Sequence, residues 1–192
     1  AALAFLANFL YAATSFGNGI IFHLGLHILQ LCGLVPAGRP VKLATADLTI
    51  LMTPTRVWQA VWLRHGIDRR LATVLAISMA ALVIPGTALV TALPTAPLKR
   101  AMGAIFLLAV LARGGAMLQA AEAEPTTPLD LASARHICIL AATGASAGLL
   151  SGLFNAAGPP LMLFLLFFRV DSLAWRSSYA LSQVLLTLLQ CG

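Results

Sequence analysis

Two glycine-centred interruptions of long apolar segments constrain the fold of this chain more than any other feature. The first, residues 15–19 (SFGNG), lies within the apolar residues 1–31, and the second, residues 155–160 (NAAGPP), lies within residues 134–168. One straight helix of the first length would measure about 46 Å, against roughly 30 Å for the hydrocarbon core of a membrane. Each segment must therefore tilt strongly, break or turn back. Because lipid offers backbone amides no partners, an unwound turn at membrane depth must be buried in protein or line a wet cavity.

The composition places these segments in a membrane. Hydrophobic residues make up 60% of the chain, charged residues 9%, and the mean hydropathy is +0.93. So few polar side chains cannot solvate the surface of a globular domain of 192 residues. We expect an all-α, polytopic transmembrane helical bundle, with the lipid bilayer as a partner and the plasma membrane as its location. The twelve Lys and Arg residues stand mostly between apolar segments, which is typical of such proteins and does not support nucleic-acid binding.

The order of the segments indicates two internal repeats. An offset of 140 positions aligns residues 17–21 with residues 157–161 without a gap. Residues 1–120 are predicted to form a first transmembrane repeat of four spans, the first of them broken, and residues 121–133 a polar linker. Residues 134–192 are predicted to begin a second repeat, which we expect to be truncated because the chain stops within an apolar segment.

Polar turns give the expected limits of the other spans. In the first repeat these spans are placed at residues 41–63, 71–93 and 101–119. In the second repeat, residues 169–176 are predicted to form a charged turn before a span that starts near Ser177. The repeats are parallel if the two broken segments are continuous and inverted if they are re-entrant, and the distribution of Lys and Arg does not decide between these arrangements.

Residues 148–161 (GLLSGLFNAAGPPL) resemble the second-repeat signature of the sulfite exporter TauE/SafE family, also known as the toluene sulfonate uptake permease family. In that signature a helix of small residues runs into a glycine-proline break. Residues 15–21 are similar to the first-repeat version, and residues 44–46 (ATA) and the turn at residues 64–68 (RHGID) agree as well. The resemblance covers the chain as one repeat plus the first two spans of the next.

This resemblance implies a transporter rather than an enzyme. Members of the family usually have two four-helix repeats, and the expected substrate is a small anion, sulfite or an organosulfonate, moved by alternating access. The chain departs from the family pattern at residues 155–157 and at Asn18, where the family carries more glycine. These departures leave the fold expectation intact and the exact substrate open.

The breaks themselves predict an anion-binding site. Pro159 suits the first position of a helix, where its missing amide hydrogen removes no intrahelical bond, so a half-helix is expected to begin there. The free amides and positive dipole end of that half-helix favour an anion beside Gly158. By symmetry Gly19 opens the other half-helix, and Gly17 is part of the same predicted site. The alternative is that glycine and proline only allow a kink and close helix packing.

Four polar side chains complete the predicted substrate site. Asn18 and Asn155 carry amides that can donate hydrogen bonds to a sulfite or sulfonate oxygen, and Ser15 and Ser151 lie about one turn away. The alternative for each asparagine is that it satisfies carbonyl groups left free by the break.

Three further residues inside apolar segments are candidates for coupling or attraction. Asp47 is a candidate proton or cation carrier, or else it lies near the membrane surface and pairs with Lys42. His23 shares a helix face with His27, which suits a proton relay or a hydrogen bond between helices; no metal site is expected because no acidic third ligand is near. Arg56 either snorkels to the surface or attracts the anion.

Enzyme chemistry finds no support in the sequence. The chain has no Ser-His-Asp order, paired carboxylates or phosphate loop, its three cysteines have neither disulfide nor zinc spacing, and no cofactor is expected. The alternative to a transporter is an intramembrane enzyme or a membrane scaffold. Breaks that lie far apart or face lipid would favour this alternative. The sequence sets no oligomeric state.

Overall fold

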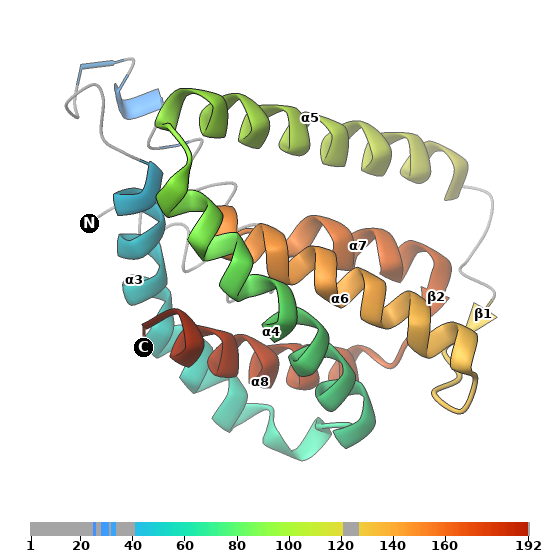
Figure 1. Cartoon of the computed structure of the whole chain (residues 1–192). Coiled ribbons are helices and arrows are strands. Elements are labelled where there is room, and N and C mark those ends of the chain that lie inside the picture. Colours follow the sequence, from blue (N-terminus) through green and yellow to red (C-terminus); the bar gives the residue numbers. More distant parts are fainter. Residues whose placement is uncertain (1–24, 26–27, 31, 34–40, 121–126, 192) are drawn as a thin grey trace.

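The computed structural model describes residues 25, 28–30, 32–33, 41–120 and 127–191, and this part of the chain is mostly helical, as predicted. The predicted site residues Ser15, Gly17, Asn18, Gly19 and His23 lie outside it. Its elements in chain order (Figure 1) are α3 (Val41–Trp62), the 3-10 helix η1 (Arg64–Gly66), α4 (Arg69–Ala92), α5 (Thr95–Ala120), β1 (Thr127–Pro128), α6 (Ala134–Phe154), α7 (Gly158–Phe167), β2 (Phe168–Arg169) and α8 (Ser172–Cys191).

The helices α3 and α4 occupy the positions expected for membrane spans, whereas α5 begins at Thr95, six residues before the start expected at residue 101. Within the described residues, α4 and α6 are both long enough and apolar enough to cross a membrane. The helices α3, α5 and α8 also have the length of spans. Polar groups on α3 and α8 are buried against other parts of the protein, as described below. The division into two repeats stays a prediction, because most of residues 1–40 lies outside the described part.

Aspartates set the starts of two helices. The carboxylate of Asp68 accepts hydrogen bonds from the amides of Arg70 and Leu71, at 2.9 and 3.1 Å, and so caps α4. In the same way, the Asp171 side chain accepts from the amide of Ala174 at 2.7 Å, and α8 begins at Ser172. The prediction of a charged turn over residues 169–176 is therefore wrong in its second half, because an aspartate cap starts the helix about five residues early.

Residues 134–168 form a helical hairpin. α7 packs beside α6 and runs back along it (Figure 1). Its end is held next to the start of α6, because β1 pairs in parallel with β2, with Thr127 opposite Phe168, and the rings of His136 and Phe168 lie 5.1 Å apart. The second break is thus the apex of a hairpin. Of the two arrangements that the sequence left open for this segment, the structure has the re-entrant one.

The described end of the predicted linker is packed against the protein. The amide of Leu129 donates to the carbonyl of Arg169 at 3.1 Å, and the side chains of Leu129 and Leu131 are partly buried on the main apolar core. This core joins α4, α6, α7 and α8, and Phe164 lies at its centre, with its ring 4.7 Å from that of Phe168 and 5.5 Å from that of Trp175. The hairpin is therefore fixed at its open end as well as along its length.

The helices α4 and α6 approach each other through glycine. Gly144, Gly148 and Gly152 recur at every fourth position of α6 and so share one face. A Cβ atom added at Gly148 would overlap the backbone of Met79, and one added at Gly86 of α4 would lie 2.8 Å from the carbonyl oxygen of Leu149. These residues leave no room for side chains, so the two backbones lie in direct contact.

Candidate functional site

The apex of the α6–α7 hairpin is a buried left-handed turn at Asn155. This residue has φ 53° and ψ 37°, its amide donates to the carbonyl of Ser151 at 2.8 Å, and the amide of Ala156 donates to the carbonyl of Leu150 at 3.3 Å. Asparagine tolerates this backbone region better than most residues with a side chain. The left-handed residue of this break is therefore Asn155 rather than Gly158, and all of residues 151–158 are buried.

The start of α7 offers fewer amides than a typical helix start. The helix begins at Gly158, with Pro159 and Pro160 in its second and third positions, so the predicted start at Pro159 is correct to within one residue. The first turn of any helix leaves amides without intrahelical partners. Since the prolines have no N–H, only Ala157 and Gly158 keep such donors here. The dipole of α7 still points its positive end at the apex, but the backbone alone makes a poor anion site.

Arg56 of α3 supplies a full positive charge at this apex. One terminal nitrogen, Nη2, donates to the side-chain oxygen of Asn155 at 2.6 Å, and the other, Nη1, donates to the hydroxyl of Thr187 on α8 at 2.8 Å. Arg56 is only 2% exposed and Asn155 only 1%. The guanidinium of Arg56 therefore does not snorkel to the surface, and its attraction of an anion, the other role left open for it, stays a prediction.

The network extends along α3. The side-chain amide of Asn155 donates to the hydroxyl of Thr49 at 3.0 Å, so Asn155 contacts α3 at two positions that lie about two helical turns apart. Thr187 in turn donates to the carbonyl of Gln183, one turn earlier in α8, at 2.8 Å. We call Thr49, Arg56, Asn155 and Thr187 the Arg56 junction. It joins α3, the hairpin apex and α8, which are far apart in the sequence.

No carboxylate neutralises Arg56 within the described part of the chain. The described part contains four aspartates. Asp68 and Asp171 cap helices, and Asp130 accepts a hydrogen bond from the amide of Ala132. Asp47 lies on α3 nine residues before Arg56, which is about 14 Å along the helix axis. Every hydrogen bond recorded for Arg56 goes to a neutral oxygen.

One member of this junction, and one residue a helical turn before Thr187 on α8, have buried side-chain nitrogens with no hydrogen-bond partner among the described residues. One is Nε of Arg56 and the other is the side-chain nitrogen Nε2 of Gln183, which is 1% exposed. Buried hydrogen-bond donors almost always have a partner in native proteins, so a buried donor without one is unusual. Both belong to the elements that meet at the hairpin apex.

The structure brings together part of the predicted site. Asn155, Gly158, Pro159 and the buried Ser151 lie at or next to the apex. Asp47 is half-buried and is not a hydrogen-bond partner of the side chain of Arg56 or of Asn155. Thr49, Thr187 and Gln183 were missed, because nothing in their own sequence neighbourhoods distinguishes them from other polar residues of a helix.

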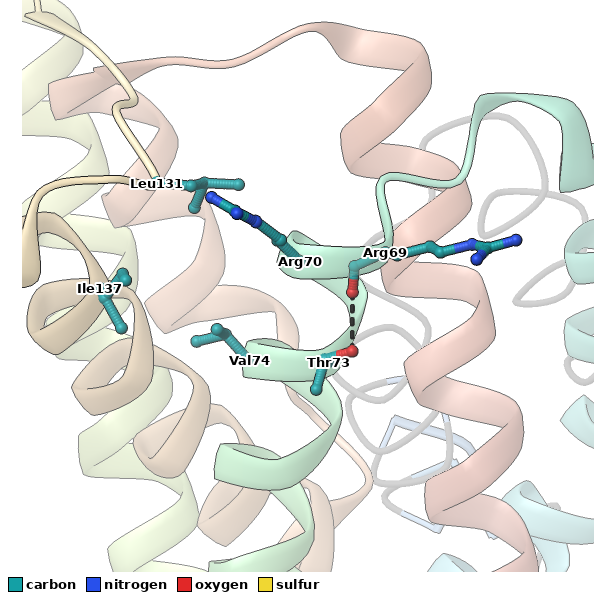
Figure 2. Close-up of a pocket in the computed structure, with 6 residues that line it drawn as sticks. All are labelled: Arg69, Arg70, Thr73, Val74, Leu131 and Ile137. Carbon is teal, nitrogen blue, oxygen red and sulfur yellow. Dashed lines mark hydrogen bonds between the residues drawn. The ribbon is translucent and has the colours of Figure 1, made fainter.

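Two cavities have no member of the Arg56 junction in their lining. One, of about 380 Å³, lies between the starts of α4 and α6 (Figure 2), where Arg70 points towards Leu131 and Arg69 points away from it. Both arginines are exposed, so their charges are solvated, unlike that of Arg56. The other, of about 530 Å³, has an almost wholly apolar lining from α6, α7 and Phe168. In the part of the chain that the structure describes, no three His, Cys, Asp or Glu side chains are close enough to hold a metal ion.

Comparison with known proteins gives one match. The model of the family described as Sulfite exporter TauE/SafE matches residues 1–191, which is essentially the whole chain. No curated protein and no solved structure matches. The match includes both breaks and confirms the resemblance drawn from residues 148–161 and 15–21.

Proposed function

We propose that this chain, which belongs to the sulfite exporter TauE/SafE family, moves sulfite or organosulfonates across the membrane by alternating access. The family consists of membrane transporters of sulfur-containing anions rather than enzymes, and this membership supports the proposal. The choice between sulfite and sulfonates, the mechanism and a plasma-membrane location are parts of the proposal.

The contact between Asn155 and Arg56 carries the proposal. A buried turn of a re-entrant hairpin is the kind of irregular backbone that membrane proteins tolerate where a solute binds. Here the turn touches a buried cation through a 2.6 Å hydrogen bond, and the described residues offer that cation no carboxylate. A buried positive charge with neutral partners attracts an anion more strongly than any exposed arginine does.

The substrate site is proposed to lie between the two breaks. Ser151, Asn155, Gly158 and Pro159 contribute the side that the structure describes, and Ser15, Gly17, Asn18 and Gly19 are proposed to contribute the other. Alternating access would then move the hairpin apex against α3 and α8 around the bound anion. Asp47 and His23 remain the candidates for proton coupling.

Flux in proteoliposomes tests this function. The full chain is reconstituted, and uptake and efflux of labelled sulfite, methanesulfonate, toluenesulfonate and sulfate are measured with and without a pH gradient. We expect flux of sulfite or a sulfonate well above that of empty liposomes, and competition between these anions. Background flux for every sulfur anion, in a preparation shown to be folded, would contradict the proposal and reopen the scaffold alternative.

Gly158→Val tests whether the apex is the site. The valine adds bulk at a buried position beside the first amides of α7, so we expect flux to fall strongly. A matched control is Gly115→Val on α5, where an added Cβ meets no atom within 4 Å. Unchanged flux and substrate affinity in well-folded Gly158→Val would show that the break serves packing alone.

A further inference from the structure

We propose that Arg56 is the residue that binds the charge of the substrate, and that its unpartnered Nε, together with the unpartnered side-chain amide of Gln183 on α8, selects oxyanions that present two oxygens side by side. This inference deepens the proposed function and rests on it. It assigns a role to a buried cation that neither the breaks nor the family match explains.

Some N–H groups of the Arg56 guanidinium have no hydrogen-bond partner among the described residues. An arginine side chain carries five N–H groups in a rigid plane. Two of them are used, by Asn155 on one side and by Thr187 on the other, and Nε has no partner among the described residues. The Nε–H group shares one edge of the guanidinium with an N–H of Nη2, the nitrogen that also donates to Asn155. Two parallel N–H groups on one edge can bind two oxygens of one oxyanion.

The known partners of Arg56 orient its charge but do not neutralise it. Asn155 and Thr187 each accept one hydrogen bond through a neutral oxygen, and they hold the guanidinium from opposite sides, the hairpin apex and α8. A buried charge without a counterion destabilises a protein, so an apolar residue of similar size would make a more stable junction. An anion that binds at the Nε edge supplies the missing counter-charge.

Gln183 provides a second unpartnered donor on α8, the helix that also carries Thr187. Its Nε2 is buried without a partner among the described residues, and it lies one turn before Thr187 on α8. Thr187 is itself in contact with Arg56. A further oxygen of a bound oxyanion could accept from this amide, which would satisfy both orphan donors with one ligand.

The donor arrangement defines the ligand class. Sulfite and sulfonates present oxygens about as far apart as the parallel N–H groups of a guanidinium, so they bind it in a bidentate manner, as carboxylates and phosphates do. A halide is a single acceptor and cannot make both bonds with good geometry. We therefore expect small sulfur oxyanions to bind more tightly than chloride or thiocyanate.

The test is direct binding to the full chain, purified in detergent, by isothermal titration calorimetry. The probes are sodium sulfite, sodium methanesulfonate and sodium chloride, and the thermal unfolding of each variant is recorded beside its affinity. Arg56→Lys keeps the charge but removes the planar fork. Gln183→Met keeps the length and volume of the side chain but removes the donor. Arg70→Gln, which removes an exposed arginine, is the control for a general loss of positive charge.

We expect Arg56→Lys to weaken binding of both oxyanions about tenfold or more, since one charge-assisted hydrogen bond is lost, and to leave chloride binding nearly unchanged. Gln183→Met should weaken oxyanion binding several-fold, and Arg70→Gln should leave it unaffected. A structural role alone would lower the unfolding temperature of the Arg56 variant without changing the preference for oxyanions over chloride.

Two outcomes overturn the inference in distinguishable ways. If wild type binds and transports oxyanions, and folded Arg56→Lys and Gln183→Met bind them with wild-type affinity and preference, the proposed function stands and the role of Arg56 and Gln183 is refuted. If wild-type protein neither binds nor transports any sulfur oxyanion, the proposed function fails and the inference fails with it.

Discussion

The α4–α6 interface brings two backbones together through glycine, whereas the Arg56 junction joins α3, the hairpin apex and α8 through side-chain hydrogen bonds. The first interface belongs to the two described helices that are apolar enough to cross a membrane on their own. The second belongs to helices whose polar residues need protein partners. The α4–α6 interface is thus a scaffold in which backbone packs directly on backbone. The Arg56 junction instead keeps a charge and unsatisfied hydrogen-bond donors inside the protein.

The glycine face of α6 ends close to the hairpin apex. Gly152, the last glycine of the α6 stripe, packs against the backbone of Val83 and Thr87 on α4. Asn155 follows three residues later and faces Arg56 and Thr49. The scaffold therefore ends within one turn of the polar region, and it holds α6 rigidly up to the point at which the chain turns back.

Gly148→Val should have the largest effect on the scaffold. Its side chain would overlap the backbone of Met79, which cannot rotate away as a side chain can. We expect a loss of stability of about 3 kcal/mol or more, at the upper end of the range for overpacked cores, so that little folded protein is recovered. Size-exclusion profiles and thermal unfolding in detergent measure this.

Gly103→Ala on α5 is the matched control for that variant. No atom lies within 4 Å of the added Cβ, so this change should shift stability by less than about 1 kcal/mol, in the stabilising direction. Wild-type yield and unfolding temperature for Gly148→Val would show that α4 and α6 can separate without harm.

Among changes that retain the fold, Asn155→Asp should have the largest effect on the Arg56 junction. Aspartate tolerates the left-handed backbone and places a carboxylate against Arg56, although it loses the donor to Thr49. The built-in anion neutralises the guanidinium, so we expect anion flux to fall roughly tenfold or more while the protein still unfolds cooperatively. Flux in proteoliposomes at equal amounts of folded protein provides the measurement, and wild-type flux would remove Arg56 from the substrate site.

Asn155→Ala should have an intermediate effect on stability. Considered as a lone hydrogen bond at the break, the change would cost only about 1 kcal/mol. The structure raises this expectation to about 2–4 kcal/mol, because the bond goes to a buried cation and because alanine resists the left-handed backbone. Asn155→Gly removes the same bonds without the backbone strain, so its loss should be smaller by about 1 kcal/mol; equal losses in chemical denaturation would show that no strain is involved.

Asp47→Asn should have the smallest effect on the fold. Asp47 is half-buried and outside the Arg56 junction, so we expect a change of less than about 1 kcal/mol in stability. If Asp47 carries a proton during transport, the variant loses the dependence of flux on a pH gradient while flux driven by substrate alone persists. A pH-gradient response equal to that of wild type would give Asp47 a structural role.

Helix positions were largely predictable from the sequence. The expected spans at residues 41–63 and 71–93 agree with α3 and α4 to within two residues at each end, because apolar runs and polar turns are local signals. The start of α8 was missed because the cap at Asp171 lies within what resembles a charged turn. The interruption of the helix at the second break was predicted at the correct residues. The residue with the left-handed backbone is Asn155 rather than a glycine.

The candidate site was predictable only in part. Asn155, Gly158 and Pro159 could be selected because they interrupt an apolar segment. Arg56 could be noticed as a charge deep in a span, but its partner could not, since Arg56 and Asn155 are 99 positions apart in the sequence and Thr187 is 131 positions away from Arg56. No local pattern encodes such pairings.

By itself, then, the sequence determined that this is a helical membrane protein of a transporter family, where its helices lie, and where one apolar segment must break. These properties follow from hydrophobicity and backbone chemistry, which act over a few turns of helix. Only the tertiary structure decided that the second broken segment turns back on itself, that Asn155 forms its apex and that Arg56 is buried there with neutral partners. Burial and hydrogen bonding depend on which helices pack together, and that is settled by the contact of α4 with α6 and of α3 with α8 rather than by any one segment.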